Sequence, residues 1–319
     1  NDVPGAGSVV NQGTITTPSG GSVYLIAPNV TNEGIINSPN GEVILAAGQT
    51  VSLIDSATPG VKVDITGAEG NATNLGQITA EAGRIGIAGV IVRNSGVLNA
   101  SSVVSDGGRI FLKANGDAMV DGGQIRATSA AGKGGQVEVL GDRVAVQGGA
   151  EIDVSGAAGG GSILIGGDYQ GANPDIRNAS FAYFGADAVL KADATDQGDG
   201  GKVIVWSDDT TKAYGSISAK GGGGSGKGGF VETSGKQSLS VDGIRVNTLG
   251  SGGMGKWLLD PASFIVAHVS GGDITDTTIN TNLQTTIVVV NAAGDIVFND
   301  DTVAIAFPIS YSYGSLTFS

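Results

Sequence analysis

A glycine-led unit repeats along the chain and constrains the fold more than any other feature. The unit is Gly-Gly-x-apolar-x-apolar, first seen at residues 20–25. Its second glycine returns at steps of about 20–28 residues, with longer steps of 42 and 40 that we interpret as two units with one glycine signal lost. The clearest second-position glycines are Gly21, Gly108, Gly135, Gly161, Gly201 and Gly229.

A second motif, Asn-x-Gly-x-apolar, lies between the glycine pairs. Its asparagines are Asn11, Asn32, Asn74 and Asn94. One interpretation is an internal ladder, in which each side-chain amide bonds to the next repeat. The other is a turn, because asparagine tolerates a left-handed backbone. The sequence leaves both interpretations open.

Apolar residues alternate with period two inside each unit, which predicts strands. In residues 22–25, Val23 and Leu25 face one side, while Ser22 and Tyr24 face the other. We expect the glycines to supply the positive φ of sharp corners. A single unit has no opposite wall for its apolar side, so the units must stack and share one core.

These patterns predict an all-β protein, a right-handed parallel β-helix of about 11–13 rungs. At ~4.8 Å per rung the rod is about 55–60 Å long, and right-handed winding follows from the preference of parallel crossovers. We expect regular rungs over 1–170, irregular loops and a glycine-rich turn over 171–260, and altered β-structure over 261–319 that caps the rod or starts a further region.

Composition excludes several classes of protein. The net charge of −13 repels phosphate backbones, so we expect no nucleic-acid partner. The chain has 0 cysteines, which excludes a disulfide scaffold and a cysteine-rich zinc site. Its 56 glycines do not follow the every-third-residue period of collagen.

The only metal that the residues suggest is calcium. Asp193, Asp196 and Asp199 place carboxylates three residues apart before a glycine pair. Calcium takes six to eight oxygen ligands, which carbonyls and water would complete. The spacing matches neither the EF-hand loop nor the nonapeptide calcium repeat, and the alternative is an acidic exposed turn. We therefore expect no resident cofactor and treat calcium as a weak candidate.

We find no catalytic constellation in the sequence. The adjacent pairs Asp208–Asp209 and Asp300–Asp301 point to opposite faces on a strand, so neither converges on one substrate. His268 lies in an apolar strand without a nucleophile. Trp206 and Trp257 offer rings for sugar stacking, although leucines flank Trp257 and favour a structural position that plugs a rung or an end. We expect the protein not to be an enzyme.

Several of these residues carry a family resemblance. Residues 11–36, which hold the Asn-Gln-Gly-Thr-Ile and Gly-Gly-Ser-Val-Tyr-Leu segments, resemble filamentous-haemagglutinin-type exoproteins, and residues 41–48 continue the match. Residues 228–235, followed by Gly-Lys-Trp-Leu-Leu-Asp-Pro at 255–261, resemble the same family. The resemblance covers about residues 7–265. The family's Asn-Pro-Asn-Gly motif is absent, so the chain looks like the shaft that follows the secretion domain.

The resemblance implies two-partner secretion from a Gram-negative bacterium. Export would use an outer-membrane β-barrel transporter, and the product would be secreted or displayed on the cell surface. We expect an adhesin shaft that binds a glycan or protein of a host or a neighbouring cell, with a role in adhesion or biofilm. The alternatives are a carbohydrate-active β-helix enzyme and a self-associating extracellular filament subunit.

Overall fold

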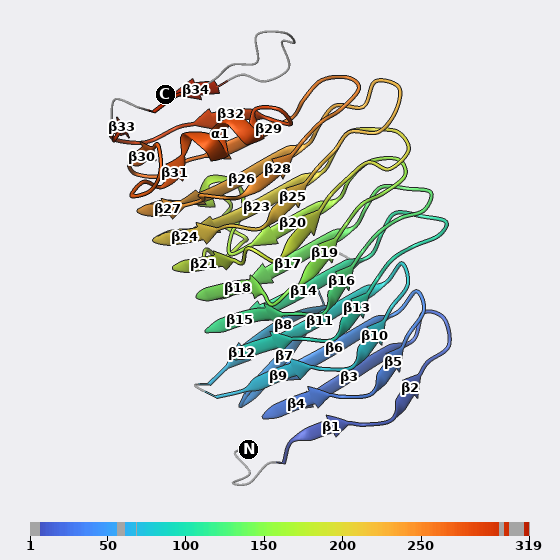
Figure 1. The fold of residues 1–319 in the computed structure, drawn as a ribbon. Helices are drawn as coiled ribbons and strands as arrows, with labels where there is room; N and C mark the ends of the chain where they lie inside the picture. The colour runs from blue at the N-terminus through green and yellow to red at the C-terminus, as the bar shows by residue number, and fades with distance from the viewer. Residues whose placement is uncertain (1–6, 56–60, 68, 300–302, 306–315, 319) are drawn as a thin grey trace.

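Three parallel sheets wind around one apolar core and form a parallel β-helix, the fold class that the repeat predicts (Figure 1). The computed structural model describes residues 7–55, 61–67, 69–299, 303–305 and 316–318. Within these residues sheets A and B each hold nine strands and sheet C holds eleven, at the lower end of the predicted number of rungs.

Each of the first nine rungs contributes one short strand to each sheet, and sheet C continues for two more strands. In pairing order, sheet A consists of β1 (Val9–Asn11), β4 (Asn29–Asn32), β9 (Asn71–Asn74), β12 (Ile91–Asn94), β15 (Asp117–Asp121), β18 (Arg143–Gln147), β21 (Phe181–Phe184), β24 (Thr210–Ala213) and β27 (Ser238–Ser240). Sheet B consists of β2 (Thr14–Thr16), β5 (Ile35–Asn37), β10 (Gln77–Thr79), β13 (Val97–Asn99), β16 (Gln124–Arg126), β19 (Glu151–Asp153), β22 (Val189–Lys191), β25 (Ser216–Ser218) and β28 (Arg245–Asn247). Sheet C consists of β3 (Ser22–Ala27), β6 (Glu42–Ala47), β11 (Arg84–Gly89), β14 (Arg109–Ala114), β17 (Gln136–Leu140), β20 (Ser162–Ile165), β23 (Lys202–Ser207), β26 (Phe230–Gly235), β29 (Lys256–Leu259), β32 (Ile287–Val290) and β34 (Leu316–Phe318).

The apolar residue of the asparagine motif fills the interior of sheet B. Ile36 pairs in register with Ile78, and Ile78 pairs with Leu98 on the next rung. All three side chains are fully buried. The same stacking of like residues continues along all three sheets, so a single apolar core runs the length of the solenoid.

The asparagines form the internal ladder, because each side-chain amide donates to the next rung. Asn11 Nδ2 lies 2.7 Å from Asn32 Oδ1, and Asn32 Nδ2 lies 2.8 Å from Asn74 Oδ1. Asn74 Nδ2 continues the chain to Asn94 Oδ1 at 2.8 Å. None of the four has a positive φ, so the turn interpretation does not apply. On the next rung Val120 takes the place of asparagine and the ladder ends.

The second-position glycines are required for close approach and not for positive φ, which corrects the expectation from sequence. None of the six named above takes a positive φ. A Cβ added at Gly135 would overlap the carbonyl oxygen of Gly108, and one added at Gly161 would overlap that of Gly135. The first position behaves differently in the early rungs, where Gly20 has a φ of 81° and Asn40 one of 52°.

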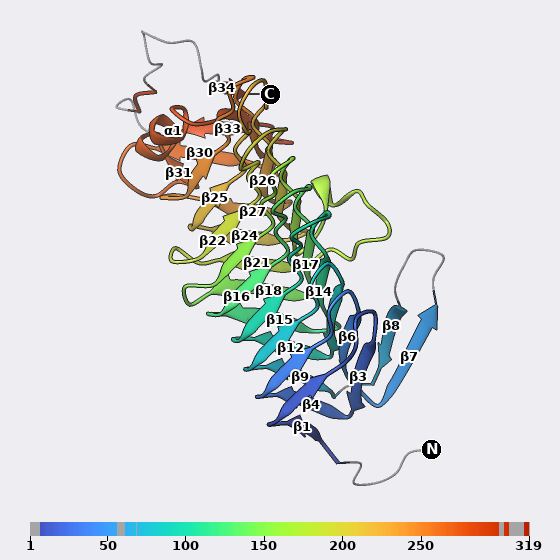
Figure 2. The same cartoon turned by 90° about the vertical axis from the view of Figure 1, so that its right-hand side faces the viewer.

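The two long spacings are single rungs with insertions, so the prediction of lost units was wrong. β6 pairs directly with β11, and β20 pairs directly with β23. The first insertion forms an antiparallel hairpin of β7 (Thr50–Asp55) and β8 (Val61–Thr66). The second is a loop over residues 166–180 that includes the short 3-10 helix η1 (Tyr169–Gly171). Figure 2 shows the hairpin and the loop projecting from the same side of the rod.

A small cap covers the C-terminal edges of sheets A and B. It contains β30 (Phe264–Ala267), β31 (Ile274–Thr275), β33 (Ile296–Phe298) and α1 (Asp276–Asn282). Asn282 in α1 accepts from Val246 N at 2.6 Å and donates to Ile244 O at 2.9 Å. These bonds replace the next strand of sheet B, whereas sheet C runs on to β34. None of the helices in the described part of the chain has the length and apolar character to cross a membrane.

We predict that glycine is essential at Gly76 and dispensable at the equivalent Gly13. A Cβ at Gly76 would overlap the carbonyl oxygen of Gly34, while a Cβ at Gly13 meets nothing within 4 Å. Gly76→Ala should therefore lower the free energy of unfolding by about 1–3 kcal/mol, and Gly13→Ala should change it by less than about 1 kcal/mol. Urea unfolding followed by circular dichroism measures both. Equal losses in the two variants would contradict the close-approach explanation.

Candidate functional surface

The outer face of sheet C is the best candidate for a functional surface, because both insertions cover it. Side chains that point away from the core in a solenoid are normally exposed. On sheet C, Ile44 and Ile204 point outward and yet are fully buried, and Phe111 is 2% exposed. A continuous apolar run, such as Ile-Leu-Ile at the end of β20, is the sequence signal of this cover.

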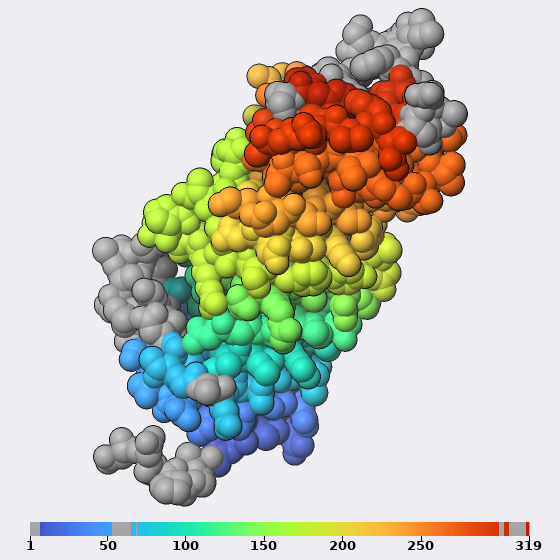
Figure 3. Space-filling view, turned by 90° about the vertical axis from the view of Figure 1, so that its left-hand side faces the viewer, coloured from blue at the N-terminus to red at the C-terminus, as the bar shows by residue number. Residues whose placement is uncertain are grey.

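Each insertion packs on its own apolar cluster. Under the hairpin the cluster contains Ile44, Ala46 and Phe111, with Val51 of β7 packed against it. Under the loop the cluster contains Leu164, Ile204 and Trp206, with Ile176 and Phe230 packed against it. Figure 3 shows the loop as a yellow-green projection beside the rod. The two insertions are thus anchored elements with small cores of their own.

A buried ion network separates the two clusters. Glu138 of β17 is fully buried and accepts from Arg109 Nη2 at 2.6 Å, while Lys113 Nζ lies 2.9 Å from its other oxygen. Burial raises the pKa of this carboxyl, but Lys113 and Arg109 outweigh that effect and hold it below its usual value. The carboxylate therefore stays charged and fixes the two cations on the face of the sheet.

The network extends toward the N-terminal rungs through Phe111 and Arg84. The Arg84 guanidinium lies 4.7 Å from the centroid of the Phe111 ring and pairs with Glu42 at 3.3 Å. Tyr24 Oη donates to the same glutamate at 2.7 Å. Successive rungs thus carry linked charged and aromatic groups, which the sequence analysis did not predict because these contacts follow no repeat.

One turn ties the hairpin to the loop. Asn115, which follows β14, donates through Nδ2 to Ile65 O of the hairpin at 2.9 Å. Its own carbonyl accepts from Arg177 Nη1 of the loop at 2.9 Å. A displacement of one insertion would therefore act on the other through this turn.

The loop is held down by polar contacts with three sheet C rungs. Lys202 Nζ donates to Asp168 at 2.8 Å, and Gln170 Nε2 donates to Asp260 at 2.6 Å. Gln170 N also donates to Glu232 Oε2 at 3.2 Å. The backbone of Gln170 has a φ of 52°, which residues other than glycine rarely adopt, and these contacts stabilise it.

Glu232 is a fully buried acid with an unpartnered oxygen. Its Oε1 has no hydrogen-bond partner among the described residues. Burial, together with the nearby charges of Asp260 and Asp168, raises the pKa of Glu232 to about 7 against the hydrogen bonds from Gln170 and Ser234. The side chain therefore changes charge near neutral pH, directly under the loop.

The calcium candidates do not gather around one point. Asp193 accepts from Ser218 Oγ at 2.6 Å and pairs with Lys220 at 3.3 Å. Asp199 accepts from Lys227 N at 2.8 Å, and Asp196 is exposed. In the part of the chain that the structure describes, no three His, Cys, Asp or Glu side chains are placed to hold a metal. These aspartates join neighbouring turns instead.

The remaining candidates have structural contacts. Asp208 accepts from Asn178 Nδ2 at 3.1 Å, and Asp300–Asp301 lies outside the described residues. His268 pairs with Asp276 of the cap at 2.8 Å.

Both tryptophans are buried, so neither presents a ring to a sugar. Trp257 is fully buried on the core side of β29 and donates through Nε1 to Thr233 at 2.8 Å. Trp206 is 3% exposed and lies under the loop. The two rings serve packing, which is the structural interpretation given for Trp257 above.

Comparison with known proteins gives an informative similarity among solved structures. No family model matches the chain, and no curated protein matches it. Among solved structures, the crystal structure of the HMW1 secretion domain from Haemophilus influenzae is 36% identical with a TM-score of 0.70. The alignment covers 80% of this chain and 67% of that chain.

We predict that Glu232 makes stability fall as pH rises toward neutrality. The folded pKa of about 7 lies above the ordinary 4.5, so the folded state holds a proton that the unfolded chain releases. Stability is fully present below the lower value and is lost as pH rises through the upper one, by about 3 kcal/mol. Glu232→Gln should flatten this dependence and make the protein more stable than the parent at pH 8.

Chemical unfolding at a series of pH values measures this effect. Glu81→Gln is the matched control, because Glu81 is an exposed acid. A pH profile that is the same in Glu232→Gln, Glu81→Gln and the parent would show that Glu232 does not titrate in this range.

Proposed function

This chain belongs to the family of the HMW1 secretion domain, among the filamentous-haemagglutinin-type exoproteins, and we propose that it forms the β-helical part of a secretion domain exported by an outer-membrane β-barrel transporter. The observation that carries the proposal is the similarity itself, 36% identity over 80% of the chain. A secreted exoprotein of a Gram-negative bacterium is the function that this kinship supports.

The physical character of the solenoid suits export in an extended state. Each strand of sheets A, B and C pairs only with the strands of adjacent rungs, so a chain that emerges progressively gains stability one rung at a time. No disulfide has to form, because the chain has 0 cysteines. A completed rung offers its edges as the template for the next.

The chain's position within the exoprotein is part of the proposal. The absent Asn-Pro-Asn-Gly motif favours a shaft that follows the secretion domain. The alignment with a secretion domain over most of the chain supports a place within that domain instead. We adopt the second position, and the export experiment below separates the two.

We also propose a non-enzymatic role in adhesion, with a ligand on a host or neighbouring cell and a contribution to biofilm. In support, Asp208, a carboxylate that the sequence offers for catalysis, accepts a hydrogen bond from Asn178, and the calcium candidates Asp193 and Asp199 are engaged in turn contacts. A filament subunit is less well supported, because α1 covers the C-terminal edge of sheet B.

Export is tested in the full exoprotein that contains this chain. We predict that removing the rungs from β4 to β28 abolishes appearance of the exoprotein outside the cell, and that deleting the transporter gives the same loss. Immunoblotting of medium, surface and periplasmic fractions measures both, with a deletion of equal length outside residues 1–319 as the control. Undiminished export without these rungs would contradict the proposal and favour the shaft.

A further inference from the structure

The loop over residues 166–180 rests on the outer face of sheet C through two kinds of contact. Ile176 packs against the apolar cluster under the loop, and Tyr169 makes an edge contact with Phe230 at 5.6 Å between ring centroids. Asp168 and Gln170 make the polar contacts with the sheet. The rungs on either side of the insertion pair directly with each other. The loop can therefore leave the sheet without breaking a pairing between rungs.

Glu232 lies where the loop meets the sheet, in surroundings that disfavour its charge. Its register partners on the adjacent rungs are Ile204 and Leu258, both of them buried and apolar. Its Oε2 accepts from Gln170 N of the loop at 3.2 Å, and its Oε1 has no hydrogen-bond partner among the described residues. An ionised Glu232 is thus a buried charge with one donor from the loop, and water reaches it only if the loop moves away.

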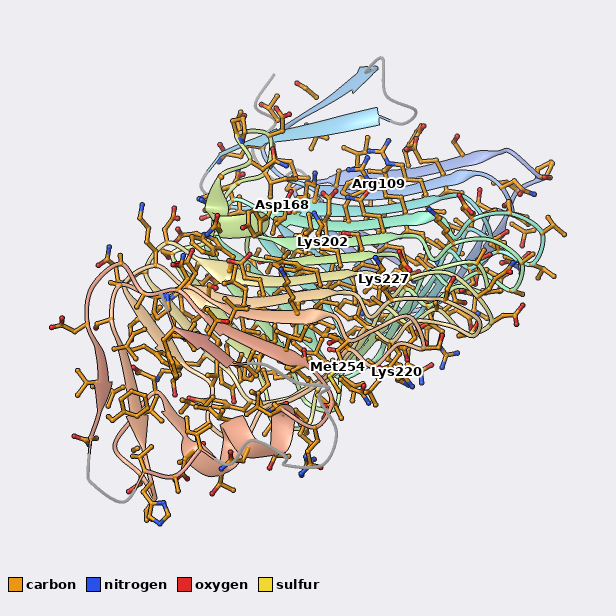
Figure 4. The ribbon with its side chains drawn as sticks, turned by 90° about the horizontal axis from the view of Figure 1, so that it is seen from above. Arg109, Asp168, Lys202, Lys220, Lys227 and Met254 are labelled. Atoms are coloured by element: carbon orange, nitrogen blue, oxygen red, sulfur yellow. The ribbon has the colours of Figure 1, made fainter. Side chains whose placement is uncertain are left out.

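The loop brings a like charge to Glu232. Asp168 faces Glu232 from the loop and is itself bonded to Lys202 Nζ at 2.8 Å, and both residues of this pair are labelled in Figure 4. The other charged residues of the loop are Asp175 and Arg177, which are exposed. Arg177 contacts the turn after β14 instead. The closed loop therefore opposes ionisation of Glu232.

The strands beside Glu232 do not supply a paired cation either. Lys202 of β23 and Lys256 of β29 each lie two residues before the position that pairs with Glu232. The turn after β29 adds Asp260, a second carboxylate that acts against ionisation of Glu232. Asp208, which follows β23, accepts a hydrogen bond from the far end of the loop. Loss of the Glu232 proton thus places a further negative charge beside Asp168 and Asp260.

The turn of the loop that covers Glu232 depends on contact with the sheet. Gln170 has a φ of 52°, donates through its backbone N to Glu232 and donates through its side chain to Asp260. A residue other than glycine keeps such a backbone only where its surroundings hold it. Separation from the sheet removes both contacts, so the turn relaxes when the loop opens.

We propose that Glu232 is a pH-sensitive switch for this loop: the protonated carboxyl keeps the loop on sheet C, and the ionised carboxylate releases it. Release uncovers the apolar cluster of Leu164, Ile204 and Trp206. The outer face of sheet C then has a closed form with the loop in place and an open form with an apolar surface, and pH selects between them. The inference concerns regulation of this face and does not depend on the export or the adhesive role.

The expected size of the effect follows from the two environments of Glu232. Its pKa is about 7 under the closed loop, and we assign the ordinary 4.5 to the hydrated carboxyl of the open form. The closed form holds a proton that the open form releases, so rising pH favours opening between these two values. From pH 5.5 to pH 8 the equilibrium constant for opening should rise about 25-fold.

Hydrogen–deuterium exchange on the intact chain tests the proposal. The amides of Gln170, Gly171 and Ala172 lie in the turn that covers Glu232. Their protection factors, corrected for the intrinsic effect of pH on exchange, should fall about 25-fold from pH 5.5 to pH 8. Glu232→Gln has no charge to gain and should abolish this fall. The matched control Glu81→Gln, which changes an exposed acid, should keep it.

Trypsin cleavage at pH 8 gives a second measurement that compares variants at one pH. Arg177 is the only lysine or arginine in residues 166–180, so cleavage after it reports on this loop. Proteolysis follows the population of the open form, and cleavage after Arg177 should be about tenfold or more slower in Glu232→Gln than in the parent. Glu81→Gln should be cleaved at the parent rate.

Three results would each overturn the proposal. The first is equal protection of the loop amides at pH 5.5 and pH 8 in the parent, which decides the matter even if a variant folds poorly. The second is a fall in protection, or a cleavage rate, that Glu232→Gln leaves unchanged. The third is loop protection that equals that of β23 at both pH values, because the loop would then open only when the whole chain unfolds.

Discussion

The close approach of successive rungs at the glycine corner is the constraint on which the rest of the structure depends. From Gly108 to Gly229, a Cβ on each second-position glycine would overlap the carbonyl oxygen of the glycine one rung below, as at Gly161 over Gly135. That carbonyl is already bonded to an amide of the next rung. The corner leaves no room for a side chain, so it repeats glycine and lies open as a groove beside the first residues of the sheet C strands.

The sequence predicts the interior well because the interior repeats. Period-two alternation identified the strands, and the recurring motif placed Asn32 and Asn74 in one file, where their amides bond. The sequence analysis assigned the wrong cause to the second-position glycines. A positive φ and a close backbone approach both select glycine, so the sequence alone does not distinguish them. The sequence analysis also interpreted the two long spacings wrongly. A rung whose glycine motif has been lost and a loop inserted into one rung both lengthen the distance between successive motifs.

The outer face was less predictable, because its burial depends on what the insertions cover. Alternation places Trp206 on the outward side of β23, where a side chain would ordinarily be exposed. The loop covers it, and it is only 3% exposed. Glu138 and Glu232 are likewise outward and fully buried. Contacts between the loop and residues far along the chain, such as Gln170 with Asp260, follow no repeat. The apolar runs in β20 and β23 were the available signal.

Similarity to a secretion domain connects this architecture with export of an exoprotein. A solenoid built from pairings between adjacent rungs suits progressive folding. Helix α1 bonds to the C-terminal edge of sheet B, and the two insertions project from one side of the rod. Both insertions bond to Asn115, so the hairpin and the loop are linked into one continuous surface. A groove lies at the glycine-lined edge of that same sheet.

The central claim is that one unbroken ladder of sheet C rungs passes beneath both insertions. Hydrogen–deuterium exchange of backbone amides tests it most directly. The account predicts slow exchange in β6, β11, β20 and β23, and faster exchange in β7, β8 and the loop at 166–180, because a two-stranded hairpin and a loop open more easily than stacked rungs. Exchange in β11 or β23 as fast as in the hairpin would contradict the direct pairing across the insertions.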